Sequence, residues 1–109
     1  MADSRIKQIK IKSGVVKRLA KEKAMYEKEA ELQRLKVEKM KEEGKDEYEI
    51  KKQEEVLQES VMMVPDCRKR LFAAHADLKN IIDSESDLAE NEDYQSAQTI
   101  LQETEESLK

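Results

Sequence analysis

The chain carries few side chains that can act as nucleophiles, metal ligands or phosphate binders. His75, the single histidine, has no cysteine and no second histidine with which to build a nucleophile pair or a metal site. The two glycines, Gly14 and Gly44, are thirty residues apart, so no glycine-rich loop precedes a helix. We therefore expect no enzyme, no catalytic residues, no metal and no cofactor.

The remaining reactive groups give no better case for catalysis. Asp and Glu together number 25, but on long exposed helices each is solvated, and an acid–base pair needs a cleft that shifts its pKa values. We expect His75 at a helix surface or at the edge of the core. Cys67 falls on an apolar seam, which predicts a buried, unreactive thiol.

The composition indicates long charged helices. Of the 109 residues, 42% are charged, 38% hydrophobic and 4% aromatic, with one proline and no tryptophan. This composition disfavours a sheet-based enzyme fold. The longest apolar stretch, residues 61–64, is far shorter than the roughly 20 residues that span a bilayer, and the N-terminus lacks an apolar signal segment. Together with the lone cysteine, this predicts a cytoplasmic protein with no membrane partner.

Apolar residues recur every seven positions in the second part of the chain. They are Ile50, Leu57, Val64, Leu71 and Leu78, with Cys67, Ala74 and Ile81 at the intervening positions. This heptad seam predicts a helix over about residues 47–83. Pro65 removes a backbone donor and crowds the preceding turn, so we expect the second helix to be bent near Pro65, with the heptad phase preserved.

The first segment, about residues 4–43, has two apolar stripes side by side. One comprises Ile9, Val16, Leu19, Tyr26, Ala30, Val37 and Met40, and the other comprises Ile11, Val15, Met25, Leu32 and Leu35. Such a broad face indicates a helix with two neighbours. A third, shorter segment has Tyr94, Ala97, Leu101 and Leu108 on one side, and we expect its helix over about residues 87–107.

Capping residues predict the ends of these helices. Gly44 is a glycine stop for the first helix, and Asp46 with Glu49 resembles a capping box for the second. Short polar side chains in residues 83–87 predict the next break. Gly14 lies inside the first helix. We expect either a tolerated glycine or a close helix contact there, or else a division at residues 13–14 between a mobile basic arm and the rigid helix.

Short connections force successive helices to run antiparallel. We therefore predict an all-α fold, an antiparallel three-helix bundle (up-down-up), as one domain over residues 1–109. A 38-residue helix extends about 57 Å, so the bundle is an elongated rod. A helical hairpin that dimerises is the competing arrangement, and the periodicity does not separate the two.

Charge changes strongly along the chain. Residues 1–40 hold 12 basic and 6 acidic residues, residues 41–83 hold 8 and 11, and residues 84–109 hold 1 and 8. Either the acidic third helix offsets the basic first helix, or part of the basic surface faces an acidic partner. Nucleic acid is disfavoured as that partner, because the pI is near 5.2 and no binding module or interleaved exposed aromatics are present.

Three segments resemble the tubulin-binding cofactor A family: residues 9–19 (IKIKSGVVKRL), 25–29 (MYEKE) and 57–67 (LQESVMMVPDC). The resemblance implies an ATP-independent cytosolic chaperone with a three-helix bundle fold. Such a chaperone captures β-tubulin, an acidic protein, after chaperonin release and passes it on for heterodimer assembly, and it meets other tubulin-folding cofactors indirectly. The resemblance also implies a cytoplasmic, cytoskeleton-associated protein.

As a hypothesis, the contact with β-tubulin lies on the outward faces of the first two helices. The basic candidates are Lys10, Lys17, Lys21, Arg68, Lys69 and Arg70, and the apolar anchors are Tyr48 and Phe72. The alternative function is a coiled-coil adaptor that binds another helical protein. A seam consumed within one chain predicts a monomer, whereas an open seam predicts a dimer or helix-in-groove binding. We expect a monomer, with a dimer left open.

Overall fold

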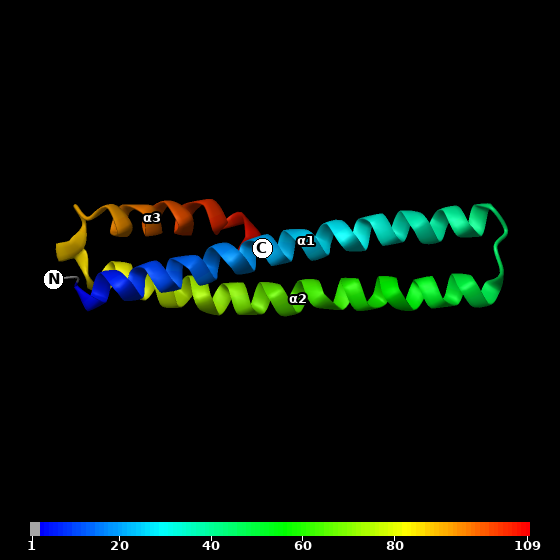
Figure 1. The fold of residues 1–109 in the computed structure, drawn as a ribbon, viewed down its shortest axis with the longest axis horizontal. Helices are drawn as coiled ribbons and strands as arrows, with labels where there is room; N and C mark the ends of the chain where they lie inside the picture. Colours follow the sequence, from blue (N-terminus) through cyan, green and yellow to red (C-terminus); the bar gives the residue numbers. More distant parts are fainter. Residues whose placement is uncertain (1–2) are drawn as a thin grey trace.

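The computed structural model describes residues 3–109, which form three α-helices and two 3₁₀ turns. The α-helices are α1 (Ser4–Glu42), α2 (Glu47–Ser84) and α3 (Glu92–Thr104), and the 3₁₀ turns are η1 (Ser86–Leu88) and η2 (Glu106–Leu108). The helices pack antiparallel in a rod of 64 × 22 × 17 Å (Figure 1). The predicted all-α, antiparallel three-helix rod is confirmed. Met1 and Ala2 of the expected domain lie outside the described residues.

The core occupies the half of the rod that α3 covers. Its buried members are Ile9, Val16 and Leu19 of α1, Leu71, Leu78 and Ile82 of α2, and Tyr94, Ala97 and Leu101 of α3. Figure 1 shows α3 lying along the end that carries the N-terminus, while the C-terminus stops near the middle of the rod. We call this end the three-helix half and residues 24–64 the two-helix half.

The heptad seam of α2 faces inward, but its burial depends on the half of the rod. Leu71 and Leu78 are fully buried beneath α3, whereas Leu57 and Val64 in the two-helix half are only half-buried. The helix is continuous through Pro65. The bend expected at Pro65 is not shown and stays a prediction.

Helix α1 ends and helix α2 begins where the capping residues predict, but one predicted cap does not form. Gly44 adopts φ +67°, and the backbone N–H of Lys45 donates to the carbonyl of Met40 at 3.0 Å, which closes a Schellman motif at the end of α1. Helix α2 begins at Glu47, but the Asp46 side chain makes no capping hydrogen bond, so the predicted capping box does not form.

Helix α3 is shorter than the expected range of residues 87–107. The 3₁₀ turn η1 occupies the predicted start, and Asn91 caps the helix instead: its Oδ1 accepts from the N–H groups of Asp93 (2.8 Å) and Tyr94 (3.3 Å). The Tyr94 hydroxyl donates to the carbonyl of Ile82 at 2.6 Å, which holds the start of α3 against the end of α2. Tertiary packing therefore selects Asn91 over the earlier polar residues.

The structure favours the interpretation of Gly14 as a tolerated glycine inside a helix. Helix α1 runs unbroken from Ser4 to Glu42, so Gly14 does not separate an arm from the helix. A Cβ placed on Gly14 meets nothing within 4 Å, so no close helix contact requires glycine. Within residues 3–109, no helix combines the length and apolar character needed to cross a membrane.

Candidate protein-interaction surface

All eight side chains expected to bind a partner are exposed. They are Lys10, Lys17, Lys21, Tyr48, Arg68, Lys69, Arg70 and Phe72. They do not form one cluster. Tyr48 lies in the first turn of α2 at the hairpin tip, whereas Phe72 lies 24 residues further along the same helix, about 36 Å away at the usual helical rise.

The three lysines of α1 have no ion-pair partner among the described residues. Within residues 3–109, no ion pair involves Lys10, Lys17 or Lys21, and all three are exposed. Other basic side chains of α1 are paired: Lys12 with Asp77, for example. The acidic third segment therefore does not neutralise these three lysines by direct pairing.

The Arg68-Lys69-Arg70 cluster is divided among different sides of α2. Arg70 pairs with Asp66 at 3.3 Å. Arg68 borders a hollow between α1 and α2, and it also lies with Lys69 and Phe72 around a second hollow near the C-terminus, which Arg70 does not line. Consecutive residues of a helix point about 100° apart, so three neighbouring cations cannot share one face.

Tyr48 is less available as an apolar anchor than its exposure suggests. The side chain is 64% exposed, but the Lys52 ammonium lies 4.7 Å from the centre of its ring. This cation–π contact covers one face of the ring with charge. Phe72, 62% exposed, is the more open of the two predicted anchors.

The sequence hypothesis missed an exposed basic and apolar stripe along the outside of α1. Met25, Leu32 and Leu35 are 46%, 58% and 48% exposed, and the spacing places Lys21 and Lys28 on the same side of the helix. We call these five residues the outer stripe. The second apolar stripe was visible in the sequence, but a neighbouring helix was expected to cover it. A charged rim interleaved with exposed aliphatic side chains is suited to protein contact.

The groups with shifted pKa values belong to surface ion pairs and to the core. The hydrogen bond from the Arg5 side chain lowers the pKa of Asp3, and that from Arg34 lowers the pKa of Glu31. Burial raises the pKa of the Cys67 thiol, which is 2% exposed. These shifts come from local pairing and burial, not from groups that meet in a catalytic cleft.

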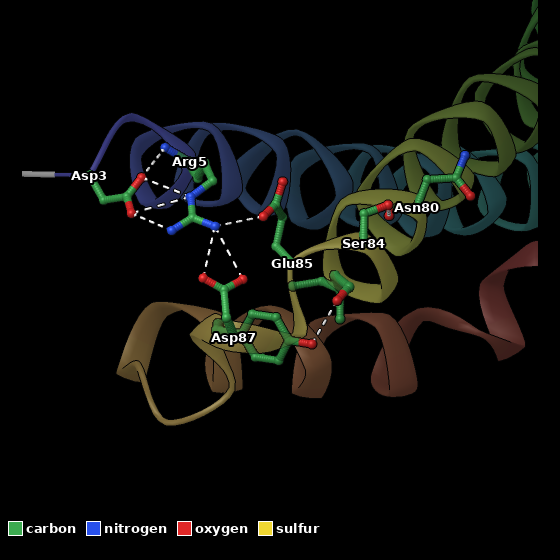
Figure 2. Close-up of polar contacts among 8 residues, drawn as sticks. Asp3, Arg5, Asn80, Ser84, Glu85 and Asp87 are labelled. Atoms are coloured by element: carbon green, nitrogen blue, oxygen red, sulfur yellow. Dashed lines mark hydrogen bonds and ion pairs between the residues drawn. The ribbon is translucent and has the colours of Figure 1, made fainter.

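The Arg5 ion pairs lie at the end of the rod where α1 begins and α2 connects to α3. Figure 2 shows the Arg5 guanidinium between Asp3, Glu85 and Asp87. Its Nη1 lies 2.7 Å from Glu85 Oε2 and 2.9 Å from Asp87 Oδ2, and its Nη2 lies 2.8 Å from Asp3 Oδ2. The start of α1 is thereby tied to the connection between α2 and α3, which is a structural role.

His75 and Cys67, the two residues considered for chemistry in the sequence, also have structural roles. His75 is buried at 6% exposure, so the helix-surface alternative was wrong, because α3 covers this part of α2. Cys67 is buried, as predicted. In the part of the chain that the structure describes, no group of three or more His, Cys, Asp or Glu side chains is placed to hold a metal ion.

The chain is similar to known proteins along nearly its whole length. A family model described as Tubulin binding cofactor A matches residues 4–101. Tubulin-specific chaperone A of Gallus gallus is 62% identical over 102 residues, which covers 94% of each chain. The solved human tubulin chaperone cofactor A has a TM-score of 0.81 at 55% identity, covering 92% of this chain and 97% of its own. Tubulin folding cofactor A from Arabidopsis thaliana has a TM-score of 0.87 at 40% identity, covering 94% and 97%.

Proposed function

The chain belongs to the tubulin binding cofactor A family, and we propose that it captures and stabilises β-tubulin after chaperonin release and passes it on for αβ-tubulin heterodimer assembly. The observation that carries this function is the family match over residues 4–101. The chain is a tubulin-folding chaperone and not an enzyme. The match favours this function over the coiled-coil adaptor.

The free lysines of α1 provide long-range attraction for an acidic client. Lys10, Lys17 and Lys21 are exposed and carry no ion pair within residues 3–109, in the most basic part of the chain. Their field accelerates encounter and orients the client, an effect that falls with salt. Arg68, Lys69, Arg70, Tyr48 and Phe72 remain further candidates on α2.

The outer stripe provides short-range contact. Met25, Leu32 and Leu35 present apolar surface on a helix that is already formed, so binding orders little of the chaperone. Capture of this kind needs no ATP, because the chaperone only has to bind the subunit better than the subunit binds to itself. Release follows when another tubulin-folding cofactor competes for the same subunit.

The proposal also covers the oligomeric state and the cellular location of the protein. We infer a monomer acting as one domain over residues 1–109, in the cytoplasm and associated with the cytoskeleton. β-Tubulin is its direct partner, and contact with other cofactors is indirect. Neither nucleic acid nor a membrane is a partner.

Gel filtration with light scattering tests this function. The chain alone is expected at its monomer mass of 12.7 kDa and, mixed with folding-competent β-tubulin, in a complex with one tubulin chain. The double variant Lys17→Glu/Lys21→Glu is expected to lose most of this complex at low salt. Lys45→Glu/Lys51→Glu, which makes the same charge change near the hairpin tip, is the matched control. Equal capture by both variants would remove the electrostatic part of the proposal, and a dimer that ignores tubulin would remove all of it.

A further inference from the structure

The groove that α3 fills in the three-helix half continues uncovered along the two-helix half. At the C-terminus, Leu108 lies with Pro65 and Phe72 around one hollow. Two further hollows of about 520 and 470 Å³ follow between α1 and α2, and they share Leu57 and Val61 in their lining. They therefore form one trough that begins where the chain ends. Figure 1 shows the same relationship: the C-terminus stops partway along the rod.

We call this trough the distal groove, with Ala30, Val37, Leu57, Val61 and Val64 as its floor. All five side chains are aliphatic: Val61 is 50% exposed, Val37 is buried, and the other three are half-buried. The floor continues the stripes that form the core. Val37 belongs to the same α1 stripe as Ile9 and Val16, and Leu57 and Val64 to the same α2 seam as Leu71 and Leu78. An apolar surface that α3 covers in one half is thus partly exposed in the other.

The length of the distal groove matches one short helix. Its lining runs from Glu27 to Lys41 on α1, which is about 21 Å at the usual rise, or about 14 residues of helix. Helix α3 itself has 13 residues. A helix packs its side-chain ridges between two neighbouring helices, as α3 does here. A second helix laid end to end with α3 would extend the three-helix arrangement to the tip of the rod.

The charged side chains along the rim indicate where a bound helix would carry an acidic side chain. Arg34 is paired with Glu31 at 2.7 Å, and Lys41 lies 3.5 Å from Glu54 across the groove. Arg68 lines the groove at the end next to α3, and no ion pair involves it within residues 3–109. A ligand helix with an acidic side chain in the turn beside Arg68 would supply the missing partner.

From this continuity, length and charge, we propose that the distal groove binds one amphipathic helix of the captured tubulin subunit, with its apolar stripe on the floor and an acidic residue beside Arg68. This inference rests on the proposed function, because the client is the tubulin subunit. It adds a second contact surface to the outer stripe. The groove recognises a preformed or folding helix, which is the kind of exposed element that an unassembled subunit presents.

Two valines of α2 allow a matched test. Val61 and Val56 are 50% and 44% exposed, but only Val61 lines the groove. Val61→Glu and Val56→Glu make the same chemical change on the same helix, and neither buries a charge. For β-tubulin, we expect Val61→Glu to raise the Kd at least about tenfold and Val56→Glu to leave it within about twofold. Circular dichroism should show that both variants keep the helicity of the parent chain.

The outcomes separate this inference from the proposed function. If the parent chain and both variants bind β-tubulin equally, the groove is not the docking site, but the chaperone function stands. If the parent chain does not bind tubulin, both proposals fail. A photoreactive p-benzoylphenylalanine at position 61 is expected to cross-link to a helical segment of tubulin. Cross-linking only to a second copy of the chain would instead identify the groove as a dimer face and overturn the proposal.

Discussion

The Nε2 atom of His75 on α2 lies 2.9 Å from the carbonyl oxygen of Leu101 in the last turn of α3. A carbonyl oxygen only accepts, so Nε2 carries the hydrogen and donates it. The N–H of Glu105 bonds the carbonyl of Gln102, so the Leu101 carbonyl lacks its usual backbone partner. Besides His75, it accepts only a long 3.4 Å bond from the Thr104 hydroxyl, which bonds the Ile100 carbonyl more closely, at 2.7 Å. His75 therefore caps the end of α3 from a neighbouring helix.

Removing this donor should destabilise the three-helix half. His75→Phe keeps a ring of similar size but leaves the Leu101 carbonyl without the imidazole N–H in a buried position. Loss of one buried partner costs about 1–3 kcal/mol, so we expect a decrease of this size in the free energy of unfolding measured by urea denaturation. His75→Gln, which retains a donor, should lose less. Equal stability of His75→Phe and the parent chain would show that the contact does not cap α3.

The pairing of Asp3 with Arg5 predicts a dependence of stability on pH. Hydrogen bonding to Arg5 lowers the pKa of Asp3 in the folded chain, so the unfolded chain binds a proton at Asp3 more readily. The stabilisation is fully present above the unfolded pKa of about 4 and is lost as the pH falls through the lower folded value. Asp3→Asn is the appropriate variant, because asparagine still caps a helix but cannot ionise.

Thermal unfolding of both proteins across the acid range provides the measurement. The parent chain should be the more stable protein near neutral pH, and the difference in unfolding midpoint should shrink as the pH falls below about 4. The lowered pKa of Glu31 arises from Arg34 in both proteins and therefore cancels in the difference. A difference that stays constant with pH would mean that the Asp3 charge contributes nothing to folding.

The helices could be predicted because their signals are local and repeated. Heptad spacing from Ile50 to Leu78 places one apolar face on a helix regardless of its neighbours, and Gly44 ends α1 through its own backbone conformation. The start of α3 could not be predicted in this way. Several residues between Ser84 and Asn91 are suitable caps, and the contact of Tyr94 with α2 decides among them.

The interaction surface was less predictable because exposure depends on where α3 ends. Leu57 and Leu71 occupy equivalent seam positions, yet only Leu71 lies beneath α3. Likewise, the sequence shows Met25 and Leu32 as a second apolar stripe without showing that no helix covers it. Lys10, Lys17 and Lys21 could be identified from charge alone, but their freedom from ion pairs follows only from the placement of the acidic residues around them.

The two glycines should respond oppositely to alanine. Gly14 lies in the middle of α1 with open space around its Cα, so Gly14→Ala should raise the free energy of unfolding by about 1 kcal/mol through helix propensity. Gly44 has φ +67°, where a Cβ costs roughly 1–2 kcal/mol, so Gly44→Ala should lower it. Urea denaturation measures both, with Gly44→Asn as the control that tolerates this conformation. A loss of stability in Gly14→Ala would contradict the open surroundings, and it would point to a contact on the outer face of α1 that glycine alone permits.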